Sequence, residues 1–320
     1  MVTAIGRIER RQQVSAWFAL QELPKHLANI LPFVLGTTLA YWQTGTVDWA
    51  VAATALVAVF FLTDGTYVSN EYFDYENDRA NSTRIGGNER IGVGTTGGTR
   101  VLVRGLIERR AALIFAVTCF ALSIPVGLLL RYGLGTGPLT IPLGVLGILV
   151  GWFYTAPPIR ACYRGLGEVF IAIAQGVVVF GAYYVQAGFD WMPLVISMPW
   201  FITLPALKIM RQFPDYEADR ETGKRGLTVI YGRERMAIAY AVLVILGMIS
   251  FIPVFWHLPW PLALLAIAPA ILFARTVKIM LGGEWRQPQR METSAVNAFV
   301  AMLLIPVSLT LAFLLDTWVR

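Results

Sequence analysis

Two short acidic segments carry residues whose types and spacing could bind a metal ion. The hexapeptide Asp74-Tyr75-Glu76-Asn77-Asp78-Arg79 recurs almost letter for letter as Asp215-Tyr216-Glu217-Ala218-Asp219-Arg220. On a helix, positions i and i+4 share a face, which pairs Asp74 with Asp78 and Asp215 with Asp219. Asn70, one turn before Asp74, extends the first row. Mg²⁺ prefers oxygen donors of this kind, together with water and substrate phosphate oxygens.

Crowded carboxylates repel one another and need nearby cations to stay ionised. The two rows therefore predict a site in which Mg²⁺ is shared between carboxylates and a diphosphate. The simpler alternative is that the acids form ion pairs at a solvated helix end with Arg79, Arg220, Lys224 and Arg225. That alternative explains neither the near-duplication nor the place of Asn70 in the first row.

The elements that must position these rows are membrane helices. Hydrophobic residues make up 56% of the 320 residues, charged residues make up 14%, and the mean hydropathy is +0.60. The apolar residues fall in runs of roughly 20, the length that spans a bilayer. We predict an all-α polytopic membrane protein with about nine transmembrane helices around a central cavity. The expected spans lie near 24–42, 49–70, 111–131, 138–156, 166–187, 192–212, 236–256, 260–282 and 294–317.

The basic residues predict the orientation of these spans. If the spans alternate, every Lys and Arg except Arg131 and Arg320 falls at one membrane face. Such a bias marks the cytoplasmic side, so both acidic rows and the mouth of the cavity are expected there. The net charge of +6 then reflects topology and phosphate binding, and no basic domain outside the membrane supports binding of nucleic acid. We expect a single domain over residues 1–320 in a bacterial or archaeal inner membrane, without a cleavable signal peptide.

Two loops beside the rows could hold a phosphorylated substrate. Residues 77–110 are rich in glycine and arginine, which permit close backbone approach and grip phosphate oxygens. The alternative for this loop is a basic connector beside anionic lipid headgroups. Lys224, in the segment Gly223-Lys224-Arg225-Gly226, could neutralise the same phosphate. The expected diphosphate-binding residues are Asn70, Lys25, Arg79, Arg84, Arg160, Arg164 and Lys224.

An isoprenoid diphosphate fits a site of this kind. Its head would lie at the acidic rows and its tail between the helices, where burial of apolar surface is favourable. Metal ions would stabilise the departing diphosphate, and aromatic faces would stabilise the allylic cation that remains.

Together these motifs resemble those of the UbiA superfamily of intramembrane prenyltransferases over nearly the whole chain. The first family motif, Asn-x-x-x-Asp-x-x-x-Asp, is met by Asn70, Asp74 and Asp78, and the second by Asp215, Asp219, Gly223 and Lys224. The stretch Tyr154-Thr155-Ala156-Pro157-Pro158 is similar to the family's segment between spans 4 and 5. The resemblance implies nine helical spans and Mg²⁺-dependent prenyl transfer. It also implies that the acids and Asn70 bind metal and diphosphate, and that Tyr154 lines the reaction centre.

Within the superfamily the chain is most similar to the menaquinone branch, which prenylates 1,4-dihydroxy-2-naphthoate. The similarity lies in residues 70–76, 97–102 and 213–219. It implies an aromatic acceptor as the second substrate. Departures from the family pattern at Glu71, Gln212 and Cys162 leave other acceptors open, namely 4-hydroxybenzoate, homogentisate and chlorophyllide.

Three further residues bear on the acceptor. Asp64 lies inside the second expected span, where an acid is a functional candidate by default. It could orient an acceptor hydroxyl, or it could make a buried polar contact with another helix. Lys208 and Arg211 could bind the acceptor's carboxylate, bind diphosphate or extend to the lipid headgroups. The expected catalytic residues are Asp74, Asp78, Asp215, Asp219, Tyr154 and Asp64.

Two other functions remain as alternatives. One is a UbiA-like terpene cyclase, in which the cation attacks its own double bonds. The other is a transporter with the acidic rows as a cation path, which the clustering of the acids at one face disfavours. The oligomeric state is left open.

Overall fold

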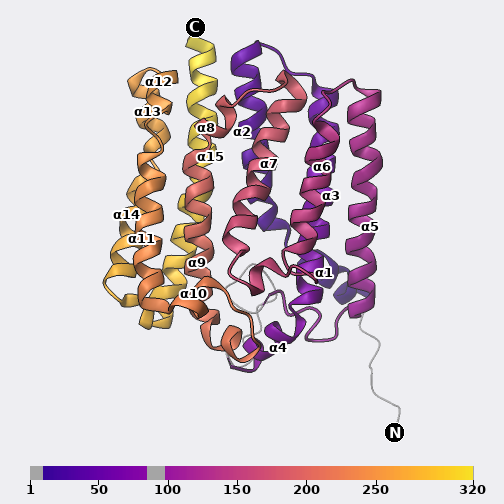
Figure 1. Ribbon diagram of the computed structural model, residues 1–320, viewed down its shortest axis with the longest axis vertical. Coiled ribbons are helices and arrows are strands. Elements are labelled where there is room, and N and C mark those ends of the chain that lie inside the picture. The colour runs from indigo at the N-terminus through magenta and orange to yellow at the C-terminus, as the bar shows by residue number, and fades with distance from the viewer. Residues whose placement is uncertain (1–9, 85–97, 320) are drawn as a thin grey trace.

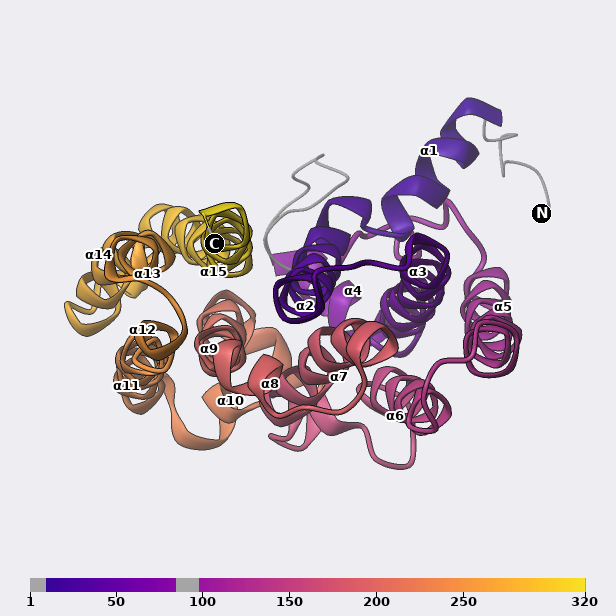
Figure 2. The same ribbon diagram turned by 90° about the horizontal axis from the view of Figure 1, so that it is seen from above.

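Figures 1 and 2 show the computed structural model, which describes residues 10–84 and 98–319. Within these ranges the chain is helical and has no strand. The helices are α1 (Arg10–Leu20), α2 (Leu27–Thr44), α3 (Trp49–Phe73), α4 (Tyr75–Arg84), α5 (Arg109–Leu128), α6 (Thr140–Phe153), α7 (Gly167–Ala187), α8 (Met192–Ile196), α9 (Met198–Glu221), α10 (Leu227–Tyr231), α11 (Arg233–Ile249), α12 (Val254–His257), α13 (Trp260–Ile267), α14 (Ala270–Leu281) and α15 (Pro288–Val319).

The long helices stand side by side in one bundle (Figure 1). Seen from above, α2, α7 and α9 lie between a group formed by α3, α5 and α6 and a second group formed by α11, α13, α14 and α15 (Figure 2). The short helices α4 and α10 lie at the lower end of the bundle in Figure 1. Each of the apolar segments expected from the sequence is helical, although three of them are divided, into α8 and α9, into α11 and α12, and into α13 and α14.

Six stretches of the described chain are long and apolar enough to cross a membrane, so the protein is an integral membrane protein. These stretches are Trp49–Phe73, Arg109–Gly133, Gly167–Ala187, Arg233–His257, Trp260–Leu281 and Thr293–Val319. The apolar helix α6 is shorter, with 14 residues, and α2 and α9 run beside the six.

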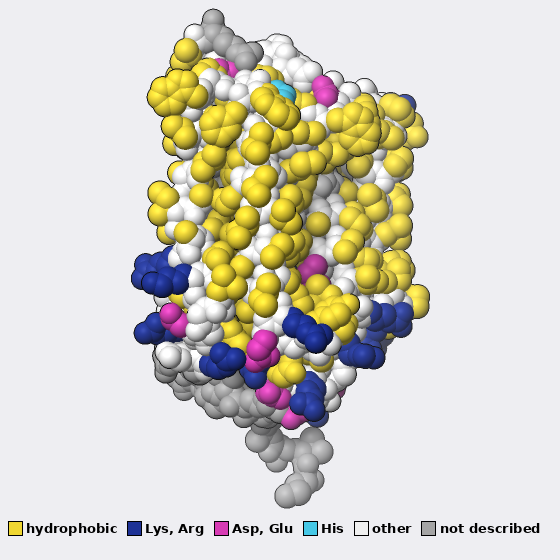
Figure 3. All heavy atoms as spheres, turned by 60° about the vertical axis from the view of Figure 1, so that its left-hand side comes forward, with side chains coloured by type: hydrophobic (Ala, Val, Ile, Leu, Met, Phe, Trp, Pro, Cys, Tyr) yellow, Lys and Arg dark blue, Asp and Glu magenta, His cyan; other side chains and the backbone are white. Residues whose placement is uncertain are grey.

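The outer surface agrees with a membrane setting. In Figure 3 hydrophobic side chains cover the middle of the bundle, and Lys, Arg, Asp and Glu side chains gather towards the end that carries α4 and α10. Large exposed tryptophans mark the opposite end, where α3 begins and α15 ends: Trp49, Trp256, Trp260 and Trp318. Tryptophans are enriched at membrane interfaces, so this distribution places the apolar band between the charged end and the tryptophan-rich end.

Local sequence explains how the helices that carry the site begin and pack. The Asp48 side chain caps α3, because its Oδ1 accepts hydrogen bonds from the backbone N–H groups of Ala50 (2.9 Å) and Val51 (3.0 Å). Gly36 lets α2 approach α7 closely, since a Cβ atom there would lie 2.2 Å from the Val179 carbonyl oxygen. Small residues at such crossings allow membrane helices to pack backbone to backbone.

The first acidic row differs from the expectation of one continuous helix. Helix α3 ends at Phe73, Asp74 has φ −86° and ψ 2°, and α4 begins at Tyr75. Hydrogen bonds still link the row at i+4 spacing, from the Asp74 N–H to the Asn70 carbonyl (2.8 Å) and from the Asp78 N–H to the Asp74 carbonyl (2.9 Å). The second row lies on one helix, because α9 continues to Glu221 instead of ending near 212.

Candidate active site

A cavity of about 520 Å³ runs through the bundle between α2, α3, α5, α6, α7 and α9. At one end it is lined by polar and charged groups, and at the other by aliphatic side chains. Eight of the residues expected to form the site line it: Lys25, Asn70, Asp74, Asp78, Tyr154, Asp215, Asp219 and Lys224.

The two acidic segments face each other across the polar end of the cavity. Lys224, which follows the second segment, donates a hydrogen bond to Asp74 Oδ2 at 2.9 Å. Asn77, inside the first segment, donates to Asp219 Oδ1 and to Thr222 Oγ1, each at 2.8 Å. Each of the two regions thus donates a hydrogen bond to the other, although the bonded residues lie about 140 to 150 positions apart in the chain. Asn77 was not expected from the sequence.

The polar end fits a hard divalent cation such as Mg²⁺. Asp74 Oδ1 is buried and has no hydrogen-bond partner among the residues that the structure describes. Within the same residues, no group of three or more His, Cys, Asp or Glu side chains is close enough to hold one metal ion by itself. Mg²⁺ typically takes only one or two carboxylates and completes its shell with water and phosphate oxygens. The donors present therefore suit an ion that arrives with a phosphorylated substrate.

Charge is concentrated at this end of the cavity. Burial raises the pKa of Asp78 well above its ordinary value, and the neighbouring carboxylates of Glu71 and Asp74 raise it further. Burial alone would lower the pKa of Lys224, but the carboxylate of Asp74 and other nearby groups raise it well above its ordinary value. Lys224 therefore stays charged, and a further cation would relieve the repulsion among the acids.

Glu71 also contributes to the polar end of the cavity. In the sequence it was notable only as a departure from the family pattern. Its Oε1 accepts from the Thr99 N–H (2.9 Å) and its Oε2 from the Thr99 hydroxyl (2.7 Å). Gly98 precedes this contact with φ +61°, and a Cβ atom there would lie 2.5 Å from Asp78 Oδ2 and 2.6 Å from Glu71 Oε1. Glu71 therefore fixes the Gly98–Thr99 backbone against the first acidic row.

The middle of the cavity is lined by amide, phenol and cationic groups. Asn70 Oδ1 accepts a hydrogen bond from the Thr155 hydroxyl at 2.7 Å. The Lys208 ammonium lies 5.6 Å from the centre of the Tyr154 ring. Arg211 lines the same stretch, one helical turn along α9 from Lys208.

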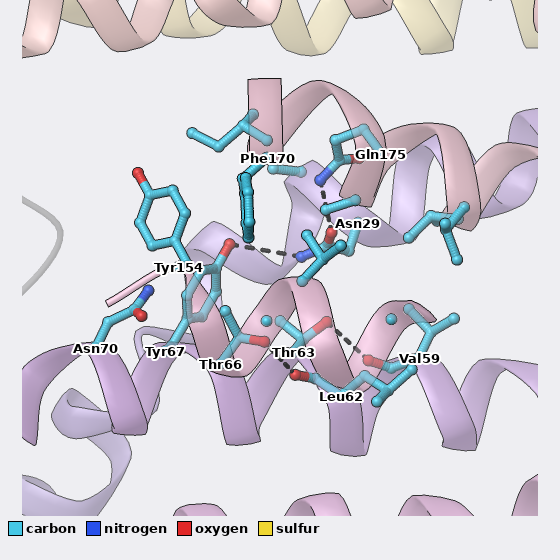
Figure 4. A pocket seen from close by; sticks show the side chains of 18 of the residues that line it. Asn29, Val59, Leu62, Thr63, Thr66, Tyr67, Asn70, Tyr154, Phe170 and Gln175 are labelled. Carbon is cyan, nitrogen blue, oxygen red and sulfur yellow. Dashed lines mark hydrogen bonds between the residues drawn. The ribbon is translucent and has the colours of Figure 1, made fainter. Parts of the chain in front are cut away.

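A hydrogen-bonded chain crosses the cavity one layer deeper (Figure 4). Gln175 Nε2 donates to Asn29 Oδ1 at 2.7 Å, and Asn29 Nδ2 contacts the Tyr67 hydroxyl at 3.5 Å. The Tyr67 hydroxyl donates to the Lys25 carbonyl at 3.3 Å. Gln175 could not be found from sequence spacing, because only the packing of α2 against α7 brings it to Asn29.

The far end of the cavity is apolar and reaches the outer surface. Ile124 and Leu128 of α5 and Val145 of α6 line the cavity, yet 53%, 44% and 48% of their surface is exposed. Gly127 and Gly144 line the same stretch, and a Cβ atom at either would meet nothing within 4 Å. The cavity therefore opens sideways between α5 and α6, within the apolar band.

Asp64 does not line the cavity. It is buried, and its Oδ1 lies 3.2 Å from His26 Nε2, a ring nitrogen that also lies 3.1 Å from the Gln21 carbonyl oxygen. Two roles were expected for Asp64, orienting an acceptor hydroxyl or making a buried polar contact. The Asp64–His26 pair fits the second role, since it links α3 to the segment before α2.

Three of the four expected arginines also lie off the cavity. Arg79 is exposed and pairs with Glu76 at 3.5 Å. The Arg160 guanidinium carbon lies 3.8 Å from the centre of the Tyr163 ring. Arg164 is exposed. The side chain of Arg84 lies outside the described residues.

Comparison with known proteins identifies the family. The model of the UbiA prenyltransferase family matches residues 29–303. The chain belongs to this family. It is therefore a prenyltransferase, and the polar end of the cavity is the candidate active site of a UbiA enzyme.

Relatives and solved structures agree with this assignment. A 1,4-dihydroxy-2-naphthoate octaprenyltransferase from Bacillus subtilis is 26% identical over 65% of this chain, and the match spans 63% of that relative's length. The protein of the same name from Mycobacterium leprae is 29% identical over 72% of this chain and 74% of its own length. The solved structure of a UbiA homolog from Archaeoglobus fulgidus bound to GPP and Mg²⁺ is 17% identical, with a TM-score of 0.65, over 90% of this chain and 99% of that one. That likeness shows that the chain has the UbiA fold.

Proposed function

We propose that this UbiA enzyme transfers a prenyl group from an isoprenoid diphosphate to 1,4-dihydroxy-2-naphthoate in menaquinone biosynthesis, with Mg²⁺ as cofactor. The observation that carries the proposal is the contact of two acidic segments at one end of a cavity that is apolar at its other end. An isoprenoid diphosphate matches this cavity, because it is charged at its head and apolar along its tail. The names of the two naphthoate-specific relatives support the choice of acceptor.

The acidic rows would hold the head of the substrate. Asp74, Asp78, Asp215 and Asp219 supply oxygen donors for Mg²⁺, and Asn70 supplies an amide oxygen. These residues would hold Mg²⁺ at the head of the substrate, where the ion would supply positive charge that stabilises the diphosphate leaving group. Lys224, held between the rows by Asp74, is placed to neutralise a phosphate oxygen.

The rest of the cavity would hold the tail and the acceptor. Aliphatic side chains line the deep end, where burial of each methylene contributes about 0.8 kcal/mol. The side opening between α5 and α6 would let a long tail continue into the lipid. The acceptor ring would lie beside C1 of the prenyl group, near Tyr154. The transfer joins C1 to the ring, releases the diphosphate, and releases the acceptor's carboxylate as carbon dioxide.

We also propose the arrangement in the membrane. The chain would form one domain of nine spans in a bacterial or archaeal inner membrane, with the acidic rows on the cytoplasmic side. The gathering of basic side chains towards the end that carries α4 and α10 supports this orientation (Figure 3).

Mass spectrometry of products tests the proposed reaction. The purified chain is incubated with Mg²⁺, a panel of prenyl diphosphates, and either 1,4-dihydroxy-2-naphthoate or 4-hydroxybenzoate in competition. We expect the prenylated naphthalenediol as the main product, with carbon dioxide released in equal amount. A preference for 4-hydroxybenzoate would refute the acceptor, and a cyclised terpene formed without any acceptor would refute transfer itself.

A further inference from the structure

Two cations on α9 line the cavity and form no ion pair with the residues that the structure describes. Lys208 and Arg211 are half-buried and lie on the cavity face of α9, together with Asp215 and Asp219. In the described part of the chain, no carboxylate lies within ion-pairing distance of either side chain. Removing a cation from bulk water without a counter-charge costs free energy. Such a pair is therefore expected to meet an anion when the site is filled.

The other polar groups nearby are already bonded within the protein. Gln212, next to Arg211, donates to Glu168 and to the Lys208 carbonyl (3.4 Å), and its Oε1 accepts from the Thr228 N–H at 3.1 Å. Lys25 is paired with Glu22. Lys208 is hydrogen-bonded to the Tyr154 side chain, but within the described residues neither α9 cation is neutralised by an ion pair with a carboxylate.

Their depth separates them from the acidic rows. At a rise of 1.5 Å per residue, Arg211 lies about 6 Å and Lys208 about 10 Å further along α9 than Asp215. The diphosphate would lie at the rows, beside Lys224, which the structure already holds against Asp74. The acceptor must lie one layer deeper, because its ring has to meet the first carbon of the prenyl group.

We propose that Lys208 and Arg211 form the binding site for the carboxylate of the aromatic acceptor. This inference rests on the proposed function and deepens it, since it assigns an anionic acceptor to named residues. The Tyr154 ring, 5.6 Å from the Lys208 ammonium, provides an aromatic face at the same depth. The two cations select a carboxylated ring over the same ring without the carboxylate.

Direct binding tests the site without catalysis. Equilibrium dialysis of the full chain compares 1-hydroxy-2-naphthoate with 1-naphthol, which lacks the carboxylate. We expect the wild type to bind the carboxylated probe about tenfold more tightly or better, as for charge-assisted hydrogen bonds. Lys208→Met and Arg211→Met should each remove most of this preference, whereas Lys208→Arg should keep it. The matched control is Arg220→Met, an exposed cation on the same helix, which should bind both probes as the wild type does.

Competition separates the acceptor's carboxylate from a phosphate. Pyrophosphate with Mg²⁺ should leave the bound 1-hydroxy-2-naphthoate in place, and Lys208→Met should raise KM for the acceptor much more than KM for the prenyl diphosphate. Displacement by pyrophosphate, or an equal rise in both KM values, would assign the cations to the diphosphate and overturn the proposal. Equal affinity of the wild type for the two probes would also overturn it, even if both Met variants fail to fold.

These results distinguish the subsite from the reaction. If the protein prenylates aromatic acceptors but shows no preference for a carboxylate, the proposed subsite is refuted and the proposed function stands. Binding of 1-hydroxy-2-naphthoate that depends on Lys208, in a protein that prenylates no aromatic acceptor, would support the subsite and remove the proposed function.

Discussion

The two acidic hexapeptides differ by one residue in sequence but are built differently in the structure. The first is divided at Asp74 between α3 and α4, whereas the second lies within the continuous helix α9. Their single difference is Asn77 against Ala218. Asn77 is the residue that reaches across to Asp219, while Ala218 is buried. The position at which the repeats diverge is therefore the position that connects them.

The comparison shows that the two rows depend on different supports. The second row is carried by its own helix. The first row is held from outside, by Lys224 on Asp74 and by the Gly98–Thr99 backbone that Glu71 fixes beside Asp78. Substitutions outside the hexapeptide should therefore disturb the first row more than the second.

The largest expected effect is loss of a carboxylate from either row. Asp74→Asn and Asp215→Asn should each lower turnover by about a thousandfold or more, because a neutral amide weakens Mg²⁺ coordination and leaving-group stabilisation. Turnover should also stop in EDTA and return with excess Mg²⁺. Product formation by quantitative mass spectrometry measures both, with folding checked by size-exclusion chromatography. Near-normal turnover by a folded Asp215→Asn variant would show that only the first row matters.

The next largest effect should come from the contact between the rows. Asn77→Asp puts a carboxylate against Asp219 in place of an amide donor, and we expect turnover to fall by about ten- to a hundredfold. Asn77→Ala, which copies the residue of the second hexapeptide, should cost less because it adds no repulsion. Both are measured as kcat/KM for the prenyl diphosphate. If Asn77→Ala is the more damaging of the two, repulsion between the rows is not what Asn77 prevents.

Much of this arrangement is visible in the sequence. The i+4 spacing and the near-duplication predict two facing carboxylate rows, and the apolar segments predict the helices that carry them. The UbiA resemblance is confirmed by the family match. These features are local in sequence, or repeated, so periodicity and motif spacing report them.

The features that the sequence does not reveal depend on contacts between distant segments. The Glu71–Thr99 and Asn77–Asp219 contacts require the folded bundle, since their partners lie 28 and 142 residues apart. Asp64 is an acid inside an apolar run, a pattern that predicts a functional residue. Its partner His26 lies on another segment, and no spacing rule connects them. The break at Asp74 has no evident cause in the local sequence.

A smaller effect is expected when one support of the first row, the Gly98 backbone beside Asp78, is changed. Gly98→Ala adds a methyl group 2.5 Å from Asp78 Oδ2, whereas Gly105→Ala meets nothing within 4 Å. Both glycines have positive φ, +61° and +68°, so both variants pay a similar backbone cost of about 1 kcal/mol. We expect Gly98→Ala to lower kcat/KM by about tenfold beyond Gly105→Ala, through displacement of the Asp78 carboxylate. Equal kcat/KM values for the two variants would mean that the Gly98 backbone does not support the row.

The smallest effect is expected at the glutamates that occupy the same place in both hexapeptides. Glu76 and Glu217 point to the outside, with 62% and 49% of their side chains exposed, and neither lines the cavity. Glu76 pairs with Arg79 at 3.5 Å and Glu217 with Arg233 at 3.9 Å, and exposed pairs of this kind contribute about 0 to 1 kcal/mol. Glu76→Gln and Glu217→Gln should therefore change kcat/KM by less than about twofold and the melting temperature by a few degrees at most. Because these acids share their hexapeptides with Asp74 and Asp215, they are matched controls for the carboxylate substitutions. A large loss of turnover at Glu217 but not at Glu76 would mean that the second segment also works through its outer face, and that the two rows differ in more than their backbone.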